Sequence, residues 1–404
     1  MCMMGVMARR MIATLLTASV LVTACTPSPA TRTQQTSVPP SKPAPVGLDV
    51  VTVTGGLEHG WDIGFLPDDQ LLVTERRGRL RLLSSADEGA EMTTVRADFS
   101  DVYDVGEGGL MGIAIHPDFA ETREFTTCQT HEEDGEPKDV RLVTWRLSED
   151  GTRARKVKPL VTGLPINPSG RHSGCRPVVT KDGALLVGTG DSADPVVPQD
   201  KTSLGGKVLR VDPETGKGLD NNPFADSDNA NTRRIITYGH RNIQGIAVQP
   251  GTDRIYVSEH GPDVDDEVNL IEFGRNYGWD PSQGGTVDSY DESVPMTDRE
   301  RFPNAMRPAW TTGDMTEALC GATFLSGEQW GALDGTLAVV ALKGAKLILL
   351  TIGKEGNAIG RTDPPELDDE YGRLRAARTG PDGALYITTT NGDDDKLLRV
   401  TPRT

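Results

Sequence analysis

A histidine and an aspartate near the middle of the chain could form a general base. His172 lies in the segment 171–176, and Asp191 ends the segment 187–191, nineteen residues further on. If these segments border two antiparallel strands, the strand ends meet and the carboxylate can orient the imidazole to accept a proton. The alternative is a surface histidine beside an aspartate in a turn, and the spacing alone favours neither interpretation.

Two further stretches could bind a ligand or a metal ion. Residues 238–245 place Arg241 and Asn242 just before an apolar strand, although a structural loop would also use such polar groups. Residues 259–267 hold four acids within five positions, after the dipeptide Gly261-Pro262. Carboxylates and backbone carbonyls suit a hard cation such as calcium, but the spacing is not that of an EF-hand loop. A solvated acidic loop is the ordinary alternative.

A group of cationic residues lies closer to the C-terminus. Lys343 follows an apolar run, and Arg373 and Arg375 alternate, so on a strand the two arginines would point the same way. Such a cluster suits an anionic ligand with several carboxylates. The alternative is a set of surface ion pairs with the acid-rich stretch 366–370 just upstream.

These residues need a fold that brings distant segments together, and an internal repeat predicts one. A short apolar strand, a Pro/Asp/Gly turn and a second apolar strand recur six times, with turns at 65–69, 116–118, 181–183, 249–251, 330–335 and 380–383. A unit that cannot bury its own apolar face must stack on its neighbours. We therefore expect an all-β fold over residues 48–404, a six-bladed β-propeller of antiparallel four-stranded blades around a central channel. The candidate residues would lie at the starts of inner strands and line the channel mouth.

The net charge of −17 over 404 residues limits the partners of the protein. A strongly acidic chain is a poor partner for nucleic acid or for an anionic lipid surface. Any anionic ligand must therefore be held by a local basic cluster.

The N-terminus reads as a targeting signal. Arg9 and Arg10 precede an apolar run that ends in Val22-Thr23-Ala24-Cys25, which resembles a bacterial lipobox. We expect residues 1–24 to be a lipoprotein signal peptide, Cys25 to carry the lipid, and the Pro/Ser/Thr-rich residues 25–47 to form a disordered tether. The protein would then be exported and held on the outer face of the bacterial cell membrane by this lipid alone. An ordinary secretory signal is the alternative.

Three cysteines remain after the signal, namely Cys128, Cys175 and Cys320. An exported protein can keep a disulfide, and an odd number leaves at least one thiol free. Cys128 lies on a strand of the second unit and Cys175 opens the third, so Cys128–Cys175 is the preferred pair. The sequence alone does not fix the pairing.

Taken together, these stretches resemble the soluble sugar dehydrogenases that depend on pyrroloquinoline quinone (PQQ), the glucose/sorbosone dehydrogenase family. The lipoprotein signal and the cysteine pattern are similar to an actinobacterial or mycobacterial branch of it. The motifs that carry the resemblance are 106–112, 116–119, His172 with Asp191, 206–212, 238–245, 259–262, 276–279, 341–344 and 373–375.

The resemblance implies a role for each candidate residue. His172 matches the base that removes the proton of the anomeric hydroxyl while hydride passes to PQQ, which would yield a lactone; Asp191 would orient it and Arg241 would stabilise negative charge on the reduced quinone. Calcium would be held by the carbonyls of Gly261 and Pro262, and a second calcium by Glu267 and Tyr277. The residues that match the cofactor site are Glu107, Arg241, Asn242, Lys343, Arg373 and Arg375. A sugar would be the substrate, and the sequence does not identify the electron acceptor.

Several positions depart from the family's pattern. Glu107 stands where glutamine is common, Cys175 replaces a glycine after the histidine, and Cys320 replaces a small hydroxyl residue. These changes leave two alternatives open. One is a propeller lipoprotein that binds a ligand or partner without catalysis, and the other is a metal-dependent propeller hydrolase of lactones.

Overall fold

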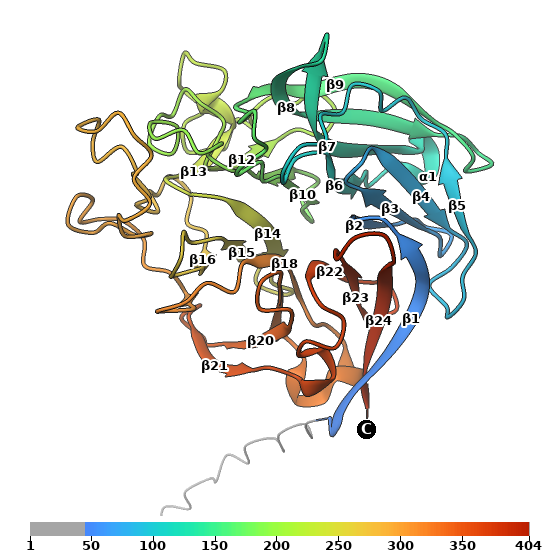
Figure 1. Cartoon of the computed structure of the whole chain (residues 1–404). Coiled ribbons are helices and arrows are strands. Elements are labelled where there is room, and N and C mark those ends of the chain that lie inside the picture. The colour runs from blue at the N-terminus through green and yellow to red at the C-terminus, as the bar shows by residue number, and fades with distance from the viewer. Residues whose placement is uncertain (1–44, 404) are drawn as a thin grey trace, which may run out of the picture. The chain divides into compact units, whose positions relative to one another are not determined.

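The computed structural model describes residues 45–403, so the predicted signal peptide, Cys25 and nearly all of the tether lie outside the described residues. Six antiparallel four-stranded sheets, here called blades 1 to 6, are arranged in a ring (Figure 1). The predicted six-bladed propeller is therefore confirmed. No helix within residues 45–403 is both long enough and apolar enough to span a membrane.

The blades follow chain order, and each is given from the channel outward. Blade 1 has β2 (Gly60–Phe65), β3 (Leu71–Glu75), β4 (Arg79–Leu83) and β5 (Met92–Val95); blade 2 has β6 (Leu110–Ile115), β7 (Glu124–Glu133), β8 (Glu136–Leu147) and β9 (Ala154–Leu164); blade 3 has β10 (Arg176–Val179), β11 (Leu185–Gly188), β12 (Lys207–Val211) and β13 (Ile235–Tyr238); blade 4 has β14 (Ile243–Val248), β15 (Ile255–Glu259), β16 (Glu267–Leu270) and β17 (Trp310–Thr311); blade 5 has β18 (Leu319–Phe324), β19 (Leu337–Ala341), β20 (Leu347–Ile352) and β21 (Ala358–Thr362); blade 6 has β22 (Leu374–Thr379), β23 (Leu385–Thr389), β24 (Asp395–Arg403) and β1 (Gly47–Leu57).

The two ends of the described chain close the ring in blade 6. Strand β1 pairs antiparallel with β24, from Gly47 opposite Arg403 to Leu57 opposite Asp395. Helix is limited to the single turn α1 (Phe119–Thr122) and the 3-10 turns Thr232–Arg234, Glu328–Leu333 and Pro365–Leu367 within residues 45–403. The predicted all-β fold class is therefore confirmed.

The repeated Pro/Asp/Gly turns form because their residues suit a tight hairpin. Gly183 and Gly383 both have a φ near +80°, at 81° and 75°, a region that glycine enters without strain. In the second of these turns the Asp382 carboxylate accepts a hydrogen bond from the backbone N–H of Ala384 at 3.1 Å. Neighbouring blades then bury apolar side chains between them, as with Leu72 of blade 1 and Trp145 of blade 2.

In five of the six blades the pairing register shifts at the start of the inner strand, between residues 60 and 62, 110 and 113, 243 and 245, 319 and 322, and 374 and 376. A bulge of this kind redirects a side chain. Residues inside the shifts include Trp61, Gln244, Cys320 and Arg375. The alternation that placed Arg373 and Arg375 on one strand face is therefore wrong, because Arg373 precedes β22 and a bulge follows it.

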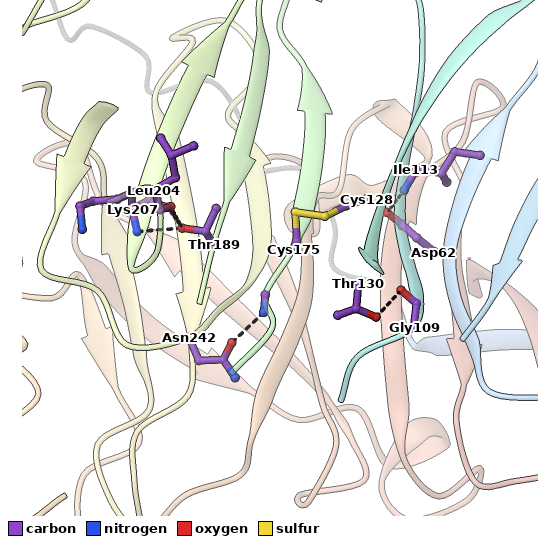
Figure 2. Close-up of a disulfide and its surroundings, with 11 residues drawn as sticks. Asp62, Gly109, Ile113, Cys128, Thr130, Cys175, Thr189, Leu204, Lys207 and Asn242 are labelled. Atoms are coloured by element: carbon purple, nitrogen blue, oxygen red, sulfur yellow. Dashed lines mark hydrogen bonds between the residues drawn. A yellow bond between two sulfur atoms is a disulfide. The ribbon is translucent and has the colours of Figure 1, made fainter. Parts of the chain in front are cut away.

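An ion-pair cluster in the channel links the blades. The fully buried Asp62 carboxylate of blade 1 lies 2.8 Å from Arg176 Nη1 of blade 3 and 2.7 Å from Arg378 Nη2 of blade 6. It also accepts the backbone N–H of Ile113 in blade 2 at 3.1 Å (Figure 2). Although burial opposes it, Arg176 and Arg378 hold the pKa of Asp62 below its usual value.

Arg176 extends this cluster to the two remaining blades. Its Nε donates to the carbonyl of Gln244 in blade 4 at 2.8 Å, and its Nη2 lies 3.9 Å from the Cys320 sulfur in blade 5. Its guanidinium stacks over the Trp61 ring at 4.1 Å. One carboxylate and two guanidiniums thus contact the inner strands of all six blades.

A disulfide joins blades 2 and 3. Cys128 of β7 and Cys175, which directly precedes β10, are bonded, with 6.1 Å between their Cα atoms (Figure 2). This is the pair preferred from the sequence. Cys320 is free and buried.

Candidate active site

The structure brings His172 and Asp191 together at the start of blade 3. The imidazole Nδ1 lies 2.7 Å from Asp191 Oδ1, and both side chains are buried, with exposures of 4% and 0%. Asp191 thereby fixes the proton on Nδ1 and leaves Nε2, which has no hydrogen-bond partner within residues 45–403, as the free basic atom. His172 has a φ of 51°, a strained conformation of the kind that clusters at functional sites.

The Asp191 carboxylate is held from several sides. Oδ1 also accepts the backbone N–H of Ala193 at 2.8 Å. Oδ2 accepts the Tyr290 hydroxyl at 2.6 Å and the indole N–H of Trp279 at 2.9 Å. The Tyr290 oxygen also lies 3.3 Å from His172 Nδ1. Burial, followed by Asp191, raises the pKa of Tyr290, so its hydroxyl remains a donor.

A second histidine shows why His172 stands out. His240 also lies nineteen residues before a carboxylate, and its Nδ1 is 2.8 Å from Glu259 Oε1. Its Nε2, however, lies 3.0 Å from the Thr237 hydroxyl, and its fully buried ring stacks on Tyr277 with centroids 4.4 Å apart. Both ring nitrogens of His240 are therefore occupied, which leaves it a structural role.

Glu107 reaches the same region from the loop before β6. Its carboxylate accepts the backbone N–H of His172 at 3.3 Å and the side-chain amide of Asn242 at 2.9 Å. Although burial opposes it, the nearby His172 and His260 lower the pKa of Glu107. Asn242 also accepts the backbone N–H of Gly174 at 3.2 Å (Figure 2). Glu107 and Asn242 are thus joined to the loop that carries His172.

Arg241 lies beside this pair but is already bound to a carboxylate. Its Nη2 is 2.6 Å from Glu292 Oε1, which Arg171 also contacts at 2.9 Å. Its Nη1 donates to the carbonyl of His260 at 3.2 Å, and its buried Nε has no partner within residues 45–403. Glu292 and Tyr290 both belong to the segment between β16 and β17, which therefore fastens onto Arg241 and Asp191.

Three predicted cations lie at the ends of inner or second strands in blades 5 and 6. Lys343 and Arg373 are exposed, and the side chain of neither makes a hydrogen bond or ion pair in the described part of the chain. Arg375 is buried, its Nη1 donates to Gln244 Oε1 at 3.3 Å, and its Nε is unpartnered among the described residues. No ion pair joins these cations to stretch 366–370 within residues 45–403, so surface ion pairing does not explain them.

The acidic loop of blade 4 is partly structural. Asp266 is fully buried and accepts the backbone N–H groups of Gly261 at 2.9 Å, Glu317 at 2.6 Å and Ala318 at 2.7 Å. It therefore shapes the Gly261-Pro262 turn rather than standing free. Within residues 45–403 no group of three or more His, Cys, Asp and Glu side chains could hold a metal ion. A site built from backbone carbonyls stays a prediction.

The predicted second calcium ligands are both buried. Glu267 accepts Asn269 Nδ2 at 2.9 Å and the Thr297 hydroxyl at 2.8 Å, and burial together with Glu259 raises its pKa to about 8. The Tyr277 hydroxyl instead donates to the carbonyl of Leu270 at 2.6 Å, and burial raises its pKa. Glu267 and the Tyr277 hydroxyl therefore share no hydrogen-bond partner among the described residues.

The family can now be assigned. The sequence pattern of the glucose/sorbosone dehydrogenases matches residues 57–399. The chain belongs to this family. The family assignment made from the sequence motifs is therefore confirmed.

Relatives cover nearly the whole propeller of this family member. The chain is 30% identical over 362 residues to the aldose sugar dehydrogenase YliI of Escherichia coli strain K12, covering 89% of this chain and 94% of that protein. A putative oxidoreductase (glucose dehydrogenase) of Thermus thermophilus has a similar structure, with a TM-score of 0.73, 33% identity, and coverage of 88% and 100% of the two chains. The PQQ-bound aldose sugar dehydrogenase of Streptomyces coelicolor also has a similar structure, with a TM-score of 0.70 and 29% identity. The match covers 89% of this chain and 99% of that chain.

Several residues of the site were not predicted from the sequence. Tyr290, Glu292 and Gln244 contact the predicted residues directly, and Trp61 stacks under Arg375 with 5.6 Å between guanidinium and ring. Gln244 lay inside a stretch that was noted for its polar residues, so it could have been found. Tyr290 and Glu292 lie in an irregular segment without a periodic pattern, and no sequence signal marks them.

Proposed function

We propose that this chain is a PQQ-dependent aldose dehydrogenase that oxidises the anomeric carbon of a sugar to a lactone. The observation that carries the proposal is the free Nε2 of His172, whose other ring nitrogen is held by a buried carboxylate. Family membership and the aldose dehydrogenases among the relatives support the same chemistry.

The charges at the mouth fit a polycarboxylate cofactor. Lys343 and Arg373 have no carboxylate partner in the described part of the chain, and the buried Arg375 Nε and Arg241 Nε lack acceptors there. In a chain with net charge −17, unpaired cations gathered at one channel mouth call for an anionic ligand. Glu107 opposes such a ligand, but its charge is already satisfied by Asn242 and the backbone of His172.

PQQ, when bound, supplies the ortho-quinone that accepts hydride from the anomeric carbon. His172 Nε2 accepts the proton of the anomeric hydroxyl, and Asp191 stabilises the resulting imidazolium. Tyr290 and Trp279 hold the Asp191 carboxylate and so fix the plane of the imidazole. Arg241 offers its free Nε–H to negative charge at the mouth, while Glu292 positions its guanidinium.

Calcium and the membrane anchor are further parts of the proposal. The carbonyls of Gly261 and Pro262 would hold one calcium ion, since Asp266 fixes the turn that presents them. Glu267 and Tyr277 would contribute to a second calcium site. Lipidation at Cys25 would hold the protein on the outer face of the cell membrane.

Cofactor binding and turnover test the proposal together. The full chain, supplied with calcium and PQQ, is expected to reduce a dye when aldoses are added. Lys343→Ala should weaken PQQ binding, measured by spectral titration, about tenfold or more, because it removes an unpaired charge. Lys354→Ala, which removes an exposed lysine on a distant turn, is the matched control and should leave PQQ binding unchanged.

The other outcomes have defined meanings. PQQ binding without dye reduction would replace the proposal with a non-catalytic binding propeller. Lactone hydrolysis without PQQ would replace it with a hydrolase. Failure of PQQ to bind in saturating calcium would overturn the assigned roles of Lys343, Arg373 and Arg375.

A further inference from the structure

A groove rimmed by arginines lies far from the channel mouth. It has a volume of about 710 Å³ and is lined by residues 96–98, 146–148 and 153–155. Four of these residues are arginines, namely Arg96, Arg146, Arg153 and Arg155, and all four are exposed. Such a concentration of cations is unexpected in a chain whose net charge is −17.

The backbone forces these arginines into like-charged pairs. Arg146 and Arg155 are direct partners in the antiparallel ladder of β8 and β9. Arg96 and Arg153 are partners in a parallel bridge that joins the outer edges of blades 1 and 2. Like charges directly opposite each other on paired strands are destabilising. Two such pairs side by side therefore leave an excess of positive charge that folding alone does not explain.

The acids nearby neutralise the groove only in part. Only Arg146 has an ion pair, with Glu124, among the residues that the structure describes. Asp98, which lines the groove, accepts hydrogen bonds from the hydroxyl and backbone N–H of Ser100. Asp150 likewise bonds within its own turn, to Ser148 and Thr152. Arg96, Arg153 and Arg155 make no ion pair within residues 45–403, and Arg153 has only a longer-range electrostatic attraction to Asp150.

The groove is separate from the candidate active site. Strand β8 runs from the mouth side at Glu136 to the opposite side at Leu147, so Arg146 lies at the end remote from the mouth. Leu147 and Ala154, which also line the groove, are buried and form the next cross-strand pair, so their side chains point to the face of the sheet opposite Arg146 and Arg155. A volume of this size is in the range that small-molecule sites occupy, roughly 300–1,000 Å³.

We propose that this groove binds a ligand carrying two or more phosphoryl groups. Each cross-strand arginine pair presents two planar guanidiniums, which match phosphate oxygens in bidentate geometry. The ligand would neutralise the repulsion within both pairs at once. The same chemistry occurs in a free pyrophosphate-containing small molecule and in the headgroups of an anionic lipid surface, and the experiment distinguishes these two sources.

The test uses the full chain and inorganic pyrophosphate, followed by calorimetry at low ionic strength. We expect a dissociation constant below about 100 µM, weakened about tenfold or more in Arg153→Gln and in Arg155→Gln and also weakened by added salt. Arg307→Gln removes an exposed arginine without an ion pair outside the groove and should bind like the unmodified chain. A second arm measures sedimentation with phosphatidylglycerol vesicles and with phosphatidylcholine vesicles.

A second readout separates a ligand site from a structural one. Without pyrophosphate, Arg153→Gln should unfold at the same or a higher urea concentration, because it removes a like-charge contact. Binding of phosphatidylglycerol vesicles that depends on Arg153 and Arg155, with no binding of pyrophosphate, would assign the site to lipid headgroups. Equal pyrophosphate binding in all variants, or no binding in either arm, would overturn the proposal.

Discussion

Replacing Asp191 by asparagine removes the negative charge that lies beside the proposed base, His172. Four donors point at this carboxylate, from His172, Ala193, Tyr290 and Trp279. An asparagine has a single acceptor oxygen, so its amide nitrogen must face two of these donors. Whichever way it turns, the fixed proton at His172 Nδ1 or the support from the aromatic donors is lost.

The magnitude follows from the distance between the groups. With 2.7 Å between Nδ1 and Oδ1, the centres of charge of imidazolium and carboxylate are about 4 Å apart, which corresponds to about 4 kcal/mol at an effective dielectric constant of 20. His172 becomes charged only as it takes the proton, so this stabilisation is absent before the reaction. Its loss predicts a kcat lower by about a thousandfold.

The assay is dye reduction by the PQQ-loaded full chain at saturating aldose. Asp194→Asn, in an exposed turn three residues away, is the matched control and should retain the original kcat. A kcat within tenfold of the original, with PQQ bound, would refute the reasoning.

Three further predictions concern the channel, the aromatic donor and calcium. Asp62→Ala should lower the free energy of unfolding in urea by about 3–5 kcal/mol, because it leaves two guanidiniums without their counter-charge. Since the folded-state pKa of Asp62 is depressed, this difference should be present at pH 7 and disappear as the pH falls below about 4. Tyr290→Phe should lower kcat about tenfold with KM unchanged, because Asp191 loses the hydrogen bond that holds it in position beside His172. Calcium binding at Glu267 should release nearly one proton at pH 7, since burial and Glu259 raise its pKa to about 8; calorimetry in two buffers of different ionisation enthalpy measures this.

Each of these predictions has a control and a contrary result. Asp394→Ala breaks an exposed ion pair with Lys396 and an exposed hydrogen bond from the backbone N–H of Gly56, and should cost about 1 kcal/mol, so an equal loss in both variants would contradict the role of Asp62. Tyr103→Phe removes a hydroxyl that bonds to the carbonyl of Pro168, and should leave kcat unchanged. Calcium binding without proton release would exclude Glu267 as a ligand.

The fold was predictable because its cause is local and repeated. Each unit carries its own turn signal, such as the Asp-Gly pairs at 182–183 and 382–383, and stacking follows from the exposed apolar faces. The closure of the ring by β1 on β24 joins residues more than three hundred positions apart. No local pattern specifies that pairing.

The residues of the candidate site were predictable where residue type and spacing along the chain indicate a catalytic role. His172 and Asp191 could be paired because inner-strand starts and second-strand ends meet at the same side of a blade. The bulges could not be foreseen, since a register shift changes which side chain faces the channel without changing composition. Arg375 is buried and Arg373 exposed for this reason.

The position of the segment between β16 and β17 could not be predicted from the sequence either. Its path is set by contacts such as Tyr290 with Asp191 and Glu292 with Arg241, and these form only after the blades are assembled. Its residues have no helical or strand period from which a position could be inferred.

The role of His172 as the catalytic base is tested by measuring aldose-dependent dye reduction by the full chain and by His172→Ala, both with calcium and spectrally verified PQQ. We predict that His172→Ala binds PQQ and loses turnover by a factor of about a thousand or more, since both the base and its charge stabilisation are removed. Turnover of His172→Ala equal to that of the unmodified chain would contradict it.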